Sequence, residues 1–345
     1  LGRLVEKSLV VSDGAGLPRF RLLESVAAIA VEEAQAAGEW EALRRSHAAW
    51  VRAHFARADA DHVELSNEHW LARYRPELDH LRVALRYAAG PGADPETAAA
   101  LAGSSVSCWF LVGLEAEALR AMELTRPFVD DSLDAAVAAQ WWLGVAMLSL
   151  RRVLPAAQAL DTCDRALALF ARLANRRQLY KLWCMRAYLC ANAGDGEAAR
   201  AAIDEAGRHE DPAWPPNVLV NRLQAESALH TMSGALDLYL EAERRAARLY
   251  AAAGKAASEL VALSNVADAQ LALGDAAAAL GTVREVIVRR RALKLSPTAA
   301  SMQVLCGALI ALGELEQARR AVADALPLAR GSGMLADLLD HVALM

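Results

Sequence analysis

The strongest constraint on the fold is a turn that recurs along the chain at a nearly constant interval. Around Gly274 the chain reads LALGDAAAALGTVREV (271–286), which predicts a helix end, a Gly-Asp turn and the start of a second helix. Gly274 can adopt the left-handed backbone that ends a helix, and Asp275 can accept hydrogen bonds from the free N–H groups of the next helix. Similar turns are predicted at Gly113, Gly194, Gly234 and Gly313 and near Val153, so successive turns lie 40, 41, 40, 40 and 39 residues apart.

A period of this size predicts a stacked array of helical hairpins, because one hairpin cannot bury its apolar face alone. When the copies are aligned on their turns, the same kinds of residue fall at the same positions. Seven positions before the turn stand Val106, Ala146, Ala187, Ser227, Ala267 and Cys306. Five positions after it stand Ala118, Ala199, Ala279 and Ala318, with Gln158 and Tyr239 as the exceptions. Trp142 and Trp183, eleven positions before their turns, are expected in the core rather than in a ligand cage.

These columns resemble the tetratricopeptide pattern over about residues 95–344. The resemblance implies an all-α superhelix of about six helical-hairpin repeats. A tetratricopeptide unit has about 34 residues, so each repeat here is longer by about six. We expect the extra residues to lengthen the second helix of each hairpin.

Composition and charge exclude several other classes of protein. The chain is 55% hydrophobic and 6% aromatic, as closely packed, alanine-rich helices require. A formal net charge of −5 argues against direct nucleic-acid binding, which needs a basic surface. The five cysteines show no metal-like spacing and are predicted to be reduced core thiols of a cytoplasmic protein. No apolar run is long enough to predict a membrane span or signal peptide.

The first 38 residues do not follow the repeat. Residues 8–12 and 19–23 predict two short strands joined by a turn, and residues 25–37 predict a helix that ends at Gly38. A helix, a β-hairpin and another helix are typical of a winged helix that lacks its first part. The chain begins at Leu1 within a predicted helix, so we expect it to be part of a longer protein.

The stretches LVEKSLVVSDGAGLPRFRLLESVAAIAVEEAQAAGE, RRSHAAWV and WLARYRPELDHLRVALRYA, within residues 1–90, resemble a family of bacterial transcriptional regulators. That family combines a DNA-binding domain, a signalling ATPase of the STAND type, a winged helix and a tetratricopeptide-like sensor. Ala27 and Ile29 stand where the family usually has Arg and Tyr. The resemblance implies that the ATPase domain, the expected partner of this segment and the binder of ATP, lies upstream of Leu1, together with the DNA-reading part.

The Gly90–Pro95 stretch is the clearest break in the chain. We therefore predict a partial winged helix over residues 1–38, connecting helices over 39–90 and the repeat domain over 91–345. The Pro-rich stretch at 211–216 is expected to be a loop between repeats, because the period continues across it.

The sequence carries no motif for catalysis or for a resident cofactor. It lacks a GxxxxGK[ST] loop, a GxSxG elbow and an HExxH motif, so no enzyme activity is predicted. His47, His54, His62, His69 and His80 lack the spacing of a metal site and are expected at the surface or at interfaces. The run Arg289–Arg291 is expected to be a solvated helix end.

The candidate site is the groove lined by the first helix of each hairpin. An effector or protein partner is expected to contact polar and aromatic side chains there, namely Gln140, Met147, Arg151, Tyr180, Tyr188, Asn192, Gln224, Asp268 and Gln303. By resemblance, the chain is then the sensor region of a transcriptional regulator, whose small-molecule or protein effector controls the upstream modules. Two alternatives stay open: an adaptor that binds a protein segment without switching, and an enzyme whose site carries no known motif.

Overall fold

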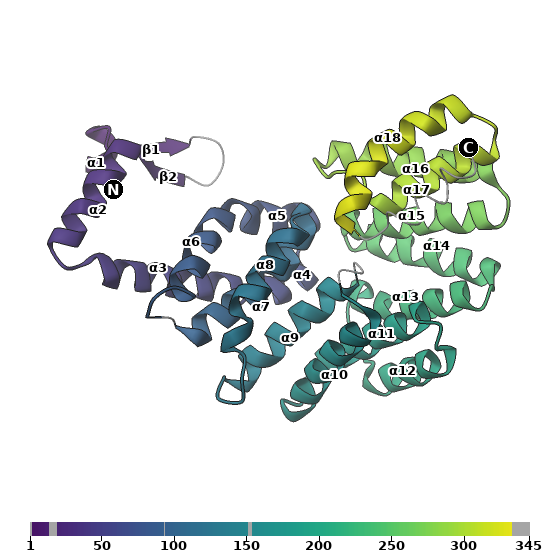
Figure 1. The fold of residues 1–345 in the computed structure, drawn as a ribbon, viewed down its shortest axis with the longest axis horizontal. Helices are drawn as coiled ribbons and strands as arrows, with labels where there is room; N and C mark the ends of the chain where they lie inside the picture. The colour runs from purple at the N-terminus through teal and green to yellow at the C-terminus, as the bar shows by residue number, and fades with distance from the viewer. Residues whose placement is uncertain (1, 14–18, 93, 151–153, 333–345) are drawn as a thin grey trace.

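The structure is a computed structural model that describes residues 2–13, 19–92, 94–150 and 154–332, with side chains to Leu328. Within these residues the chain is helical apart from one β-hairpin, which confirms the all-α prediction. Figure 1 shows the N-terminal elements at one end and the stacked helices at the other.

The N-terminal part contains α1 (Gly2–Glu6), β1 (Val10–Asp13), β2 (Arg19–Leu22) and α2 (Glu24–Ala36). The strands pair antiparallel, with Val10 opposite Leu22 and Asp13 opposite Arg19, so the predicted hairpin is confirmed. Arg19 ties the hairpin to the next part of the chain, because its Nη1 lies 2.7 Å from Oε1 of Glu77. The assignment of this part to a winged helix stays a prediction.

Four helices and a 3₁₀ turn connect the hairpin to the array: α3 (Trp40–Phe55), α4 (Ala58–Glu64), α5 (Asn67–Tyr74), η1 (Arg75–Glu77) and α6 (Leu78–Ala88). Phe55, Trp70 and Tyr74 are fully buried among them. Trp70 donates its indole N–H to the Ala58 carbonyl at 2.9 Å, and the Tyr74 hydroxyl donates to Asp61 at 2.7 Å. These two bonds hold α4 and α5 in a fixed bend.

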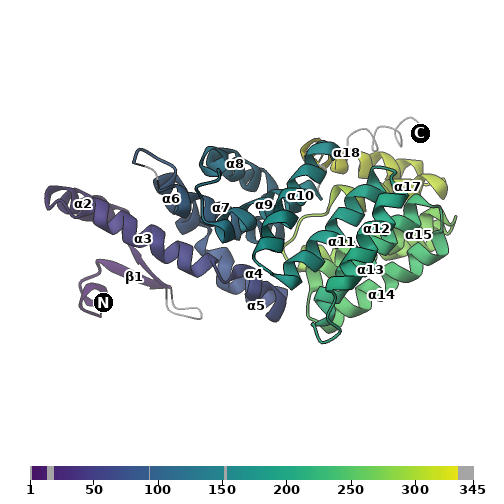
Figure 2. The same ribbon diagram turned by 90° about the horizontal axis from the view of Figure 1, so that it is seen from below.

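The array consists of six hairpins among the described residues from 95 onward. Their helices are α7 (Pro95–Val112), α8 (Glu115–Thr125), α9 (Ala135–Ser149), α10 (Ala156–Arg172), α11 (Arg176–Asn192), α12 (Gly196–His209), α13 (Pro216–Met232), α14 (Leu236–Ala252), α15 (Ala256–Ala272), α16 (Ala276–Ala292), α17 (Ala299–Ala311) and α18 (Leu315–Ser332); a 3₁₀ turn, η2 (Arg126–Phe128), follows α8. Consecutive helices pack antiparallel, and the stack curves into the superhelix seen in Figures 1 and 2.

The predicted glycine turns are confirmed where the structure describes them. Gly113, Gly194, Gly234, Gly274 and Gly313 all have φ between +72° and +86°. Asp275 caps α16 by accepting from the amide of Ala278 at 3.0 Å. The turn predicted near Val153 lies outside the described residues.

The extra residues are expected in the second helix of each hairpin, but the first helices can be equally long. In α13, α14, α15 and α16 the first and second helices both have 17 residues. Two antiparallel helices joined by a tight turn bury most apolar surface when they match in length, so both helices share the extra residues.

One apolar core crosses the predicted boundary near Gly90. It runs from Ala48 and Val51 in α3 through α6 and the first two hairpins to Leu189 in α11. Close approach within it requires small residues: a Cβ on Gly103 of α7 would lie 2.8 Å from the backbone nitrogen of Trp141 in α9. The division at residue 90 stays a prediction, since the two parts share this core.

Several smaller expectations can be compared with the structure. All five cysteines are free and buried, as predicted. Trp142 is buried in the core and Trp183 is half-buried against it. Arg289 forms ion pairs with Glu259 and Glu285. No helix in the described part of the chain combines the length and apolarity that crossing a bilayer needs.

Candidate functional site

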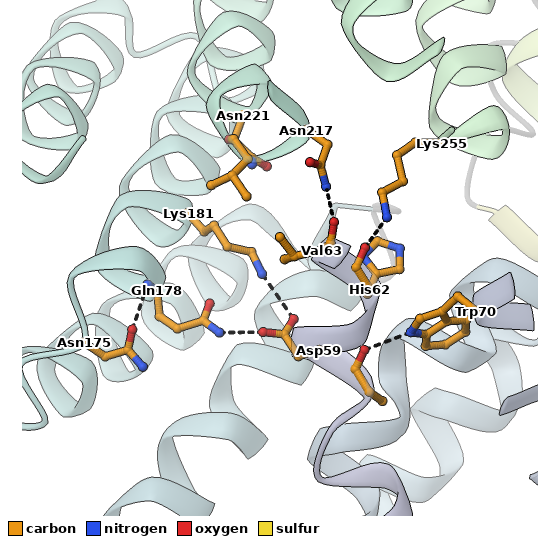
Figure 3. Close-up of polar contacts among 12 residues, drawn as sticks. Asp59, His62, Val63, Trp70, Asn175, Gln178, Lys181, Asn217, Asn221 and Lys255 are labelled. Carbon is orange, nitrogen blue, oxygen red and sulfur yellow. Dashed lines mark hydrogen bonds and ion pairs between the residues drawn. The ribbon is translucent and has the colours of Figure 1, made fainter. Parts of the chain in front are cut away.

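The candidate site is the face of the array formed by the first helices of the third, fourth and fifth hairpins, α11, α13 and α15. We call this the inner face. The segment 58–67, which comprises α4 and the start of α5, lies directly against it (Figure 3). We call these residues the inner segment. The array thus already holds a piece of its own chain where a ligand groove was predicted.

At one end of the inner segment, Asp59 is held by two side chains of α11. Gln178 donates its amide to Oδ2 of Asp59 at 2.7 Å, and the Lys181 ammonium donates to Oδ1 at 3.2 Å. Burial alone would raise the pKa of Asp59, but the Lys181 charge and the two hydrogen bonds outweigh it and hold that pKa below its ordinary value. The carboxylate is therefore ionised at neutral pH and serves as a fixed anchor.

In its middle, the inner segment is held through its backbone. The side-chain amide of Asn217, at the start of α13, donates to the Val63 carbonyl at 3.1 Å. The ammonium of Lys255, just before α15, donates to the carbonyls of His62 and Leu65. Lys255 is 2% exposed, and burial lowers its pKa. Contacts of this kind recognise the path of a polypeptide rather than its side chains.

At the other end, Asn67 bonds to the turn that precedes α15. Its amide donates to the Gly254 carbonyl at 3.1 Å, and its side-chain oxygen accepts from the amide of Ala257 at 3.0 Å. The inner segment therefore bridges three successive hairpins near the N-terminal ends of their first helices. Burial and the neighbouring Lys255 lower the pKa of His62 to about 4, so this histidine is neutral at physiological pH.

The structure distributes the predicted groove residues over different environments. Gln140 and Met147 of α9, Tyr188 of α11, Gln224 of α13 and Gln303 of α17 are half-buried, and Asn192 and Asp268 are exposed. Arg151 lies outside the described residues. Their role in binding stays a prediction.

Tyr180 is placed inside the array rather than on its open face. It is fully buried, donates to the Leu219 carbonyl at 2.8 Å and packs edge-on against Trp214. The neighbouring residue Lys181, thirteen positions before the Gly194 turn, occupies the register of Gln140 in the preceding hairpin and contacts the inner segment. A shift of one residue along a helix turns the side chain by about 100°. Tyr180 therefore points into the array, while Lys181 points toward the inner segment.

Two of the predicted residues carry hydrogen bonds that join neighbouring hairpin helices. Gln224 accepts from the Tyr250 hydroxyl at 3.1 Å, and Asp268 accepts from the Tyr239 hydroxyl at 3.2 Å. Although the Asp268 side chain reaches solvent, the surrounding helices desolvate it enough to raise its pKa.

Sequence reasoning missed the residues that hold the inner segment: Asp59, Gln178, Asn217 and Lys255. A faint signal exists, since Gln178, Asn217 and Ala257 recur at intervals of 39 and 40 residues near the start of their helices. Only the position of the inner segment reveals what they contact.

The described residues hold no cluster of three or more His, Cys, Asp or Glu side chains suited to a metal ion. His47 and His80 instead form a hydrogen bond with each other at 2.9 Å between α3 and α6, as expected for interface histidines.

No protein-family model matches the chain, and no curated protein sequence matches it. Solved structures do match. A tetratricopeptide repeat protein from Parabacteroides merdae is 15% identical, with 79% of this chain and 97% of that chain covered and a TM-score of 0.50. A Rap protein complexed with competence and sporulation factor is 11% identical, with 88% and 78% covered and a TM-score of 0.58.

A third match covers almost the whole chain. It is a signal transduction ATPase with numerous domains (STAND), with a tetratricopeptide repeat sensor, from Pyrococcus horikoshii. Identity is 13%, 98% of this chain and 47% of that chain are covered, and the TM-score is 0.57. The present chain thus spans about half the length of the STAND protein. At these identities the likeness establishes the fold: a tetratricopeptide-like superhelix.

Proposed function

We propose that this chain is the sensor and regulatory region of a cytoplasmic transcriptional regulator. In this proposal the inner face binds an effector or a protein partner, and binding controls an ATPase and a DNA-binding module encoded upstream. ATP belongs to that upstream module, and the present segment needs no cofactor and performs no catalysis of its own.

The observation that carries the proposal is the inner segment. Residues 58–67 connect the N-terminal hairpin and α3 to α6. They also occupy the inner face through Asp59, His62 and Val63. A ligand that competes for the same polar groups would loosen these contacts. Such a ligand shifts the equilibrium between the docked and undocked inner segment only by its difference in affinity for the two states. Because the inner segment is continuous with the N-terminal part, undocking would also move that part.

The arrangement along the chain is consistent with this function. The region that resembles the regulators lies within residues 1–90, and the tetratricopeptide-like fold follows it directly. A STAND protein with a tetratricopeptide repeat sensor shares the fold over 98% of this chain. This likeness supports the proposal through shape alone.

The contacts to the inner segment also favour a second candidate, a tetratricopeptide adaptor. Asn217 and Lys255 bind main-chain carbonyls, and Asn67 bonds to the backbone around Gly254. Backbone-directed groups accept many peptide sequences, so the inner face is suited to protein–protein interaction without any switch. The adaptor needs no coupling between the inner face and an ATPase.

The coding sequence upstream of Leu1 distinguishes the two candidates. A continuous reading frame with a P-loop, preceded by a DNA-binding motif, is the expected result for the regulator. A start codon directly upstream, without either motif, would overturn the regulator and leave the adaptor.

A functional test follows in the longer regulator. Replacing Asp59 by Asn and Lys181 by Met removes one anchor of the inner segment, and we expect a change in ATP hydrolysis and in transcription from a reporter promoter. Arg319→Met, which removes an exposed ion pair with Glu316 within α18, is the matched control. Unchanged ATP hydrolysis and transcription in the double variant would contradict coupling through the inner segment.

A further inference from the structure

A network of polar side chains lies within the fourth and fifth hairpins, away from the inner segment. The Ser227 hydroxyl of α13 donates to Oε1 of Glu243 in α14 at 2.5 Å. Asn265 of α15 lies close enough to the Glu243 carboxyl to affect its pKa, and the Tyr239 hydroxyl donates to Asp268 at 3.2 Å. We call Ser227, Tyr239, Glu243, Asn265 and Asp268 the acidic cluster.

The repeat register shows that these residues replace core positions. Ser227 stands where four other copies have Val or Ala and one has Cys, and Tyr239 stands where four copies have Ala. Glu243, nine positions after its turn, is matched elsewhere by apolar residues or threonine: Met122, Thr162, Ile203, Val283 and Val322. A carboxyl group at this column costs free energy that the apolar residues avoid, so packing alone does not account for it.

Within the described residues, the carboxyl groups of Glu243 and Asp268 form no ion pair. Glu243 is 2% exposed, and its Oε2 has no hydrogen-bond partner in the described part of the structure. Neither Glu243 nor Asp268 forms an ion pair with a Lys, Arg or His side chain among the described residues. Burial raises the pKa of Glu243 to about 7; Ser227 and Asn265 oppose the shift, and the Asp268 charge adds to it.

The acidic cluster can be reached from the inner face. Asp268 is exposed, and Tyr188 of α11 is half-buried. Both residues stand six positions before the turn of their own hairpin, Gly274 and Gly194 respectively. Tyr188 lies close enough to Tyr239 to raise the pKa of Tyr239. The inner segment contacts the opposite ends of α11, α13 and α15. About ten residues, or about 15 Å along a helix, separate the two regions, so the inner segment leaves the acidic cluster open.

We propose that the acidic cluster recognises a cationic group, a protonated amine or a guanidinium, on the effector that binds the inner face. The Asp268 carboxylate supplies a charge-assisted hydrogen bond, and the half-buried ring of Tyr188 supplies an electron-rich face for the cation. Glu243 is buried near Asp268 and can add a second negative charge, because a bound cation would stabilise the ionised form of its carboxyl group. The inference rests on the proposed function, because it names the chemistry of the effector.

The test is isothermal titration calorimetry of the intact chain at low salt and at pH 8, which is above the pKa of about 7 of Glu243. The probes are agmatine and a short Gly/Ala peptide with one arginine, each compared with a neutral twin that carries urea or citrulline in place of the guanidinium. We expect the cationic probes to bind and the neutral twins not to bind. Agmatine binding assigns the cation to a small effector, and binding of the arginine peptide alone assigns it to a peptide.

Asp268→Asn keeps the size of the side chain and its acceptor oxygen for Tyr239, and we expect it to raise the Kd of the cationic probe about tenfold or more. Asp275→Asn should leave the Kd unchanged. Asp275 is an exposed helix cap seven residues from Asp268, and Asn can cap the helix in the same way. Circular dichroism melts verify that both variants fold. Equal Kd values for the two variants, equal binding of the neutral twins, or no binding of either cation at millimolar concentration would each overturn the inference. Any of these results leaves the upstream ATPase, and so the proposed function, untouched.

Discussion

The buried ammonium of Lys255 donates a hydrogen bond to the main-chain carbonyl of His62, 193 residues earlier in the chain. The same ammonium also donates to the Leu65 carbonyl. A buried cation with carbonyl partners and no carboxylate is costly unless every donor is used. These two hydrogen bonds join the inner segment to the fifth hairpin.

Lys255→Met is expected to weaken the docking of the inner segment. The substitution leaves two buried carbonyl groups without donors, and we expect a loss of about 1–3 kcal/mol in the free energy of unfolding. Urea denaturation measures this loss, and hydrogen exchange should become faster in residues 58–67. Lys294→Met, at an exposed position, is the control; equal losses in both variants would contradict a docking role for Lys255.

The Asp59–Lys181 pair should show measurable coupling. In a double-mutant cycle of Asp59→Asn and Lys181→Met we expect an interaction free energy of about 1 kcal/mol, since both side chains are about 80% buried and in direct contact. The pKa of Asp59 lies below its unfolded value of 3.8, so this stabilisation is present above about pH 4 and disappears as the pH falls further. Additive single-mutant effects at pH 7 would show that the pair does not anchor the segment.

Glu243 should make the array less stable as the pH rises. Its pKa is about 7 in the folded chain against 4.5 ordinarily, so the folded state holds a proton that the unfolded state releases between these values. The contribution of Glu243 to the stability therefore falls between about pH 4.5 and pH 7, by up to about 3 kcal/mol.

Glu243→Gln should abolish this slope and be more stable than the parent chain at pH 8. Thermal melts across pH 4–8 measure it, with the exposed Glu241→Gln of the same helix as control. A difference in stability between the parent chain and Glu243→Gln that stays constant between pH 5 and 7 would exclude a neutral, buried Glu243.

Ala174 lies at φ +50° in the turn that leads from the second to the third hairpin. This left-handed backbone is strained for any residue with a Cβ. We expect Ala174→Gly to stabilise the chain by about 0.5–1 kcal/mol, measured as a higher melting temperature. At Ala253, where φ is −86°, the same change should instead destabilise it; a gain at both sites would refute the role of strain.

The sequence predicted the array because its signal is local and periodic. Each glycine turn and each small residue in a column follows from the packing of one hairpin, and six copies reinforce one another. Turns such as that at Ala174 escaped notice because an alanine there carries no turn signal, and tertiary packing imposes the left-handed backbone.

The candidate site was predictable only in part. Asp268 and Gln224 are candidates because they are polar residues on apolar helices, and their role in binding stays a prediction. Tyr180 was assigned to the groove one residue away from Lys181, which is the side chain that reaches the inner segment. The inner segment left no periodic trace: Asp59 and Lys181 are 122 residues apart, and no rule of local spacing links them.

The inner segment also has a consequence for how the array unfolds. In an ordinary repeat protein each unit contacts only its neighbours, so folding can begin anywhere and spread. Here Asp59, Val63 and Asn67 join three hairpins to a distant part of the chain, which raises the mean sequence separation of contacts and slows folding. The hairpin α17–α18 makes none of the contacts described for the inner segment, so it should open first, while the three bridged hairpins melt together as one cooperative unit.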